Sequence, residues 1–256
     1  MAFEWLFRKS KKRLTLALPD RETRARNTGD VNLKPYAPEA KDLLGQLAYL
    51  QLSYFEILTN ELKFSPNISY KAELSEAATK SFDKYRTLAK RLDATGDSRE
   101  AIAPFAERIT AFHNSTRGLD WYEQIIKIYL VSGLLDDFYR LLAVGVDPLS
   151  RADVEKALND KTIEKFSKRV LTEAMSANPI LASRLALWGR RIMGDVLLEL
   201  RAAFDNRKLA GIAKTKKLSE AEARQVNLDA YSKLEPLVSE LIGAHTLRME
   251  AIGLAA

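Results

Sequence analysis

Carboxylates that lie among apolar residues are the first candidates for chemistry in this chain. Glu56 lies in the segment YFEIL (54–58), and Asp136 and Asp137 lie inside the strongly apolar segment 119–144. A carboxylate in such surroundings has to be paired with a cation, protonated or bound to a metal ion. It could therefore be a metal ligand or an acid in a cavity. We expect structural pairing rather than catalysis, because an unpaired buried charge costs several kcal/mol.

The spacing around Asp136 indicates a polar helix face. Tyr129, Ser132 and Asp136 recur at intervals of three or four residues, so they share one side of a helix. That side is polar enough to line a small cavity. Asp137 points about one third of a turn away, and we expect it at the rim beside a lysine or an arginine.

The residue types that are missing exclude several kinds of site. The chain has no cysteine, so disulfides, thiolate metal sites and cysteine nucleophiles are excluded. The two histidines, His113 and His245, are isolated, and we expect them to be solvated or hydrogen-bonded rather than metal ligands. No serine has a histidine-plus-acid arrangement, and no glycine-rich phosphate loop occurs. A cysteine-free chain suits a reducing compartment, and we expect a cytoplasmic protein.

Helical periodicity extends over most of the chain after residue 38. Apolar residues recur at intervals of three and four, and no stretch of useful length alternates as a strand would. The segment 119–144 is apolar on most of its circumference, which predicts a helix at the centre of a bundle, with Asp120 as its N-cap. We therefore predict an all-α bundle of at least four core helices with extra helices outside. The predicted helices span residues 39–63, 70–92, 100–113, 119–144, 150–176, 178–206 and 219–250.

Part of the sequence resembles a known family. The resemblance rests on LDWYEQIIKIYLVSGLLDDFYR (119–140), LALWGRRIMGDVL (185–197) and GAHTLRMEAIGLAA (243–256). These segments are similar to ferritin-like proteins of actinobacteria that are grouped with tRNA hydroxylases acting on an isopentenyl-adenosine. The resemblance covers roughly residues 38–256 and implies a ferritin-like four-helix bundle with additional packed helices. It also implies a di-iron cofactor, held by a Glu from each of two helices and a Glu-x-x-His pair from each of the other two.

The residues that the resemblance would assign to iron are only partly present. By position, Glu56 matches the single carboxylate of the first helix, and Asp136 or Asp137 matches that of the third core helix. No Glu-x-x-His sequence occurs anywhere in the chain. The positions where it would fall hold Ser81, Asp83, Lys84 and Arg86 in one helix and Asp160, Lys161, Glu164 and Lys165 in the other.

Cations at those positions argue against a metal. A lysine ammonium or an arginine guanidinium has no lone pair to give and repels a metal ion. We therefore expect no metal cofactor, and in the alternative case Glu56, Asp136 and Glu164 are the candidate ligands. Arg191 is our first candidate for an interior cation that neutralises Glu56 or Asp136 in place of the metal.

The first 34 residues differ from the rest in charge. They hold nine lysines and arginines against four acids, an excess of five within a net charge of +6 for the whole chain. We divide the chain into a basic arm (1–34) and a helical bundle (35–256). Aromatic residues precede the densest cations of the arm, so it could lie on an anionic membrane, hold RNA phosphates or dock on the bundle. Those cations are Arg8, Lys9, Lys11, Lys12 and Arg13.

Three functions from different classes are compatible with these features. We favour a non-catalytic module that binds RNA, protein or a small ligand. The alternatives are an oxygen-dependent hydroxylase of a modified tRNA adenosine with a carboxylate-rich site, and a peripheral membrane protein anchored by the arm. A protein partner or a second copy of the chain is compatible with each of them.

Overall fold

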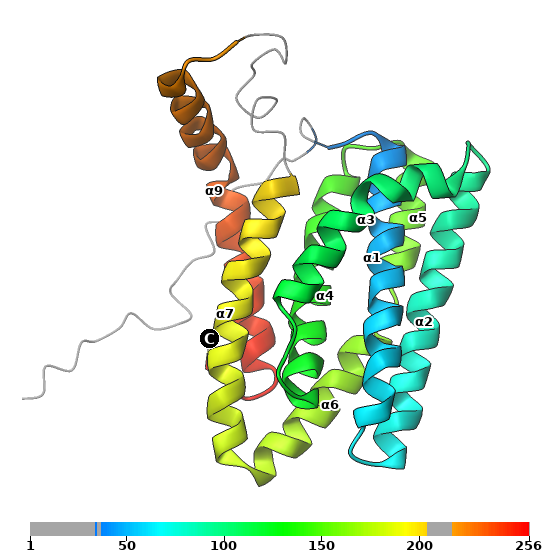
Figure 1. Cartoon of the computed structure of the whole chain (residues 1–256), viewed down its shortest axis with the longest axis vertical. Coiled ribbons are helices and arrows are strands. Elements are labelled where there is room, and N and C mark those ends of the chain that lie inside the picture. The colour runs from blue at the N-terminus through cyan, green and yellow to red at the C-terminus, as the bar shows by residue number, and fades with distance from the viewer. Residues whose placement is uncertain (1–33, 35–36, 204–216, 256) are drawn as a thin grey trace, which may run out of the picture.

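The computed structural model describes residue 34 and residues 37–203 and 217–255, and these ranges are helical with no strand (Figure 1). The predicted all-α fold is confirmed. The elements are α1 (Ala40–Glu61), the short 3-10 helix η3 (Leu62–Phe64), α2 (Ile68–Asp93), α3 (Ser98–Ser115), α4 (Trp121–Ala143), α5 (Pro148–Leu158), α6 (Thr162–Ala177), α7 (Pro179–Ala203) and α9 (Glu220–Glu250). The basic arm, with the cations named above, lies outside the described residues.

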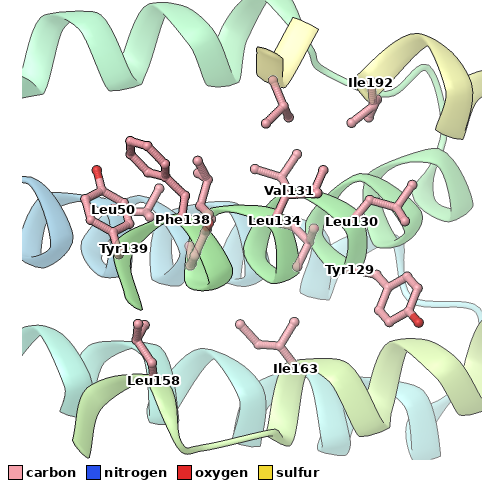
Figure 2. Packing of buried hydrophobic residues seen from close by; sticks show 14 of the residues in the cluster. Leu50, Tyr129, Leu130, Val131, Leu134, Phe138, Tyr139, Leu158, Ile163 and Ile192 are labelled. Atoms are coloured by element: carbon pink, nitrogen blue, oxygen red, sulfur yellow. The ribbon is translucent and has the colours of Figure 1, made fainter. Parts of the chain in front are cut away.

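Helix α4 is the centre of the bundle, as its apolar circumference predicts. It begins where Asp120 accepts a hydrogen bond from the backbone N–H of Glu123, and it packs against α1, α5, α6, α7 and α9. Figure 2 shows Ile192 of α7 on one side of α4, and Leu158 and Ile163 of α5 and α6 on the other. Because α4 is covered from several directions, a polar side chain on it has to find its partner inside the protein.

Helices α1 and α2 form an antiparallel pair, and α3 covers the outer side of α1 (Figure 1). The approach of α3 is close at Gly45, where a Cβ atom would overlap the carbonyl oxygen of Ala101. Further along, the hydroxyls of Tyr49 and Thr110 are 2.7 Å apart. The side of α1 that carries Gly45 and Tyr49 therefore faces α3 rather than the centre of the bundle.

The fourth core helix is broken, which corrects the continuous helix expected over 150–176. Residues 159–161 separate α5 from α6, and the carboxylate of Asp160 accepts hydrogen bonds from the N–H and the hydroxyl of Thr162. The start also differs: α5 begins at Pro148 rather than at residue 150, and Asp147 caps it by accepting hydrogen bonds from two backbone N–H groups. The carbonyl of Leu158, left free at the end of α5, accepts from the Arg140 guanidinium at 2.6 Å.

The last two helices close the other side of the bundle. Asn178 caps α7 by accepting from the backbone N–H groups of Ile180 and Leu181, as expected for a helix that begins there. Helix α9 packs against α4 and α7, while its first half leans away from the bundle (Figure 1). No helix in the described ranges has both the length and the apolar character needed to cross a bilayer.

Candidate functional site

A small cavity of about 20 Å³ lies in the interior of the bundle, beside the polar face of α4. It has room for about one water molecule. Its walls come from α1, α2, α4, the α5–α6 junction, α6 and α9. The lining residues are Gln51, Tyr54, Lys84, Tyr129, Ser132, Gly133, Asp136, Asp160, Lys161, Ile163, Glu164 and Arg248.

Asp136 is the most confined acid of this central cavity. The residue is 9 % exposed, and burial raises the pKa of its carboxyl to about 6, while Lys84 and Lys161 hold that pKa from rising further. No hydrogen bond to its carboxylate is found among the described residues. The two lysines therefore stabilise its charge at a distance rather than by direct contact.

Lys84 is the cation that reaches deepest toward Asp136. Its ammonium lies 3.5 Å from the carboxylate of Asp160 and donates to the Asp160 carbonyl at 3.4 Å. Burial would raise the pKa of Asp160, but Lys84 and the hydrogen bonds from Thr162 together lower it. The break between α5 and α6 thus exposes a carbonyl and a carboxylate to one lysine, which an unbroken helix would not do.

Two further cavity residues were missed from the sequence. The Gln51 Oε1 atom and the Tyr54 hydroxyl are buried and have no hydrogen-bond partner in the described part of the chain. Burial, followed by the charge of Asp136, raises the pKa of Tyr54 well above its usual value. A signal was present: Gln51 and Tyr54 continue the buried stripe of Leu47 and Leu58 at spacings of three and four residues.

The rim of the cavity is closed by ion pairs. Arg248 of α9 passes over Gly133, where a Cβ atom would overlap its side chain, and donates to the Asp137 carboxylate at 2.7 Å. The expected place of Asp137 at a rim, beside a cation, is confirmed. Lys161 and Glu164 of α6 lie 3.6 Å apart on the opposite side.

Several expected site residues lie elsewhere. The expectation that Glu56 faces the interior is wrong: it is exposed beside α3, because the Gln51 and Tyr54 side of α1 is the one that turns inward. Arg191 is also exposed and lies over the ring of Trp188, so it neutralises no interior acid.

In α2 the expected motif positions divide between the interior and the surface. Ser81 is fully buried and donates to the carbonyl of Ala77 in its own helix. Asp83 pairs with Arg86 at 2.6 Å near the surface. Of these positions only Lys84 reaches the central cavity.

The histidines also depart from expectation. His113 and His245 are both buried, and neither ring has a hydrogen-bond partner among the described residues. Burial lowers the pKa of His113 to about 3 and that of His245 to about 4, so both rings are neutral at pH 7. Neither of them lines the central cavity.

The donors of the central cavity do not fit a di-iron centre. Asp136, Asp160 and Glu164 provide carboxylates, but Lys84 and Lys161 bring ammonium groups among them, and no histidine is present. Within the described ranges, no three histidine, aspartate or glutamate side chains are placed to hold one metal ion. Two iron ions would add at least about four positive charges to a site that already holds two lysines.

The fold and its interior define a class of protein. The chain is an all-α helical bundle of ferritin-like architecture whose interior carboxylates face lysines. The sequence matches the family model of the ferritin-like domain of actinomycetes over residues 34–214, and the chain belongs to that family. A comparison with curated proteins found no significant match. The matched range includes α1 to α7 and ends before α9 begins.

Proposed function

We propose that this chain is a non-catalytic member of the ferritin-like fold, in which lysine charge has replaced metal charge, and that it works as a binding module. One observation carries the proposal: Lys84 pairs with Asp160 and also acts electrostatically on Asp136. An ammonium at that point supports the folded bundle without a cofactor.

Charge balance supports this interpretation. Lys84 pairs with Asp160 and Lys161 pairs with Glu164, and the remaining acid of the cavity, Asp136, is stabilised by both lysines and by Arg140. The pKa of Asp136 is raised only to about 6, although the residue is buried, because the lysines oppose the effect of burial. An interior built for metal would leave its carboxylates in excess when no metal is bound.

The size of the central cavity also supports a role without chemistry there. A space of about 20 Å³ has no room for a nucleoside or another substrate of that size. We therefore assign binding to other surfaces of the molecule. A relationship to the tRNA hydroxylase-like group remains part of the proposal, with the degenerate motifs of α2 and α6 marking the loss of iron.

RNA or an anionic membrane is the partner that the charge of the arm favours. Residues 1–34 lie almost wholly outside the described residues, so the support comes from their composition. Binding through lysines and arginines to phosphates should weaken steeply with salt. RNA gel-shift and vesicle-pelleting assays at two salt concentrations, on the full chain and on a chain lacking residues 1–34, test this partner.

The non-catalytic assignment is tested by anaerobic titration of Fe(II) into the full chain, followed by calorimetry. We expect no saturable binding in the natural sequence. A Lys84→Glu/Lys161→Glu variant restores carboxylates at the expected ligand positions, and we expect it to gain affinity for Fe(II). Lys165→Glu is the matched control, because Lys165 is exposed on α6. Saturable binding of about two Fe(II) per natural chain, lost in Asp136→Asn, would overturn the proposal.

A further inference from the structure

A second and larger pocket lies between α1 and α3, next to the start of α4. Its volume is about 110 Å³, and it shares no lining residue with the central cavity. Apart from Ile57, its walls are polar or charged. The residues that matter here are Glu56, Asn60, Glu61, His113, Asn114 and Arg117.

His113 is the buried wall of this α1–α3 pocket. Its ring is held between Tyr54, at a centroid distance of 5.8 Å, and Phe112, at 5.3 Å. Its carbonyl accepts a hydrogen bond from the buried ammonium of Lys127 at 2.7 Å, which fixes this turn of α3. Both ring nitrogens are buried without a partner. A neutral imidazole therefore leaves one donor and one acceptor unsatisfied beside the pocket.

The pocket also holds opposite charges that do not touch. Glu61 is 5 % exposed, and burial raises the pKa of its carboxyl, while Arg117 is the cation that opposes this rise most. Nevertheless neither residue forms an ion pair within 4.0 Å in the described part of the chain. Glu56 adds a second carboxylate at the exposed side, also without an ion pair among the described residues. The charges are thus arranged around the space rather than against one another.

These features restrict the kind of molecule that would fit. Two carboxylates are balanced by Arg117 and the nearby Lys127, so a ligand with a large net charge gains little. The carboxylates and the imidazole do not form a group that could hold a metal ion. A volume of about 110 Å³ is smaller than an apolar cavity of about 150 Å³ that holds benzene, so by proportion it encloses about four or five non-hydrogen atoms.

We propose that the α1–α3 pocket binds a small zwitterion of the α-amino-acid class. Its ammonium lies against Glu61 and Glu56, its carboxylate pairs with Arg117, and the ring of His113 completes the hydrogen bonds at the buried end. Such a molecule carries a cation and an anion a few bonds apart. It can therefore pair with Glu61 and with Arg117 at the same time, although these two residues form no ion pair with each other. This site goes beyond the non-catalytic assignment and does not depend on the iron content of the central cavity.

The test is calorimetry on the full chain with glycine, L-alanine and L-serine as probes. Acetate and methylammonium carry only one of the two charges, and we expect them to bind at least about tenfold more weakly than the best zwitterion. Glu61→Gln and Arg117→Gln should each weaken binding of that zwitterion by about tenfold or more. Glu107→Gln is the matched control, because Glu107 is exposed on α3 and does not line the pocket.

His113→Leu separates a binding role from a structural one. Leucine removes two unpartnered polar atoms at similar bulk, so we expect a higher melting temperature together with loss of binding. Absence of binding for all three zwitterions at about 20 mM, a concentration that detects even millimolar dissociation constants, would overturn the proposal. Binding that is unchanged in Glu61→Gln and Arg117→Gln would overturn it equally.

Discussion

Asp136→Asn should stabilise the protein at neutral pH. The pKa of Asp136 rises from 3.8 to about 6 on folding, chiefly because its carboxyl is buried. At about 1.36 kcal/mol per pKa unit, the charged carboxylate costs about 3 kcal/mol of folding free energy above pH 6. A folded-state pKa above the unfolded value means that the folded chain binds more protons between pH 4 and 6. Stability from this group is therefore fully present below about pH 4 and is lost as the pH rises through about 6.

The assay is urea unfolding of the natural chain and the variant at pH 4.5 and pH 7.5, followed by circular dichroism. We expect Asp136→Asn to gain about 2–3 kcal/mol at the higher pH and much less at the lower one. Asp83→Asn is the control, since Asp83 pairs with Arg86 near the surface and should change stability little at either pH. Destabilisation by Asp136→Asn at pH 7.5 would refute the account, because it would mean that the charged carboxylate is needed.

Three further predictions follow from contacts of the central cavity and from the arm. Lys84→Met should lower the free energy of unfolding by about 1–3 kcal/mol at pH 7.5, measured by urea unfolding, because it leaves Asp136 and Asp160 without their nearby cation. Combining it with Asp136→Asn should recover part of that loss. Gly133→Ala should be about neutral, or destabilising by up to about 1 kcal/mol, because the new Cβ atom displaces the Arg248 guanidinium from its ion pair and this loss offsets the higher helix propensity of alanine. Gly194→Ala, in open space on α7, should instead gain about 0.5–1 kcal/mol, and an equal effect at both glycines would contradict the close approach. Deleting residues 1–34 should abolish any binding to RNA or to anionic vesicles, and unchanged binding would exclude the arm.

The helical architecture could be predicted because its signals are local. The apolar density of 121–143, the Asp120 cap and the Asn178 cap each act within one or two turns, and the structure has all three. The polar face of α4 could also be predicted, because Tyr129, Ser132 and Asp136 are polar residues among apolar neighbours. Such features depend on helix geometry alone.

The orientation of α1 could not be predicted in the same way. It is apolar on nearly every side, because α2 and α4 cover one part of it and α3 covers another. Periodicity then gives no single inward direction, and Glu56 was assigned to the interior instead of Gln51. Gln51, which lies within the regular apolar stripe of α1, was the better indicator of which side of the helix faces the cavity.

The cation of the interior was misassigned for a related reason. Arg191 and Lys84 are both cations on core helices, and sequence alone does not say which one points inward. The break at Asp160 decides this, because it creates the carbonyl and carboxylate that Lys84 meets. No glycine or proline marks the break in the sequence, because residues 159–161 are Asn-Asp-Lys within an otherwise regular helical pattern of apolar residues.

The central claim is that lysine charge replaces metal charge inside this bundle. Its most direct test is elemental analysis of the full chain after production in iron-rich medium, with purification free of chelators. The account predicts no stoichiometric iron, with Asp136 stabilised by Lys84 and Lys161 instead. About two iron atoms per chain, reduced in number by Asp136→Asn or Glu164→Gln, would contradict it and would restore the hydroxylase alternative.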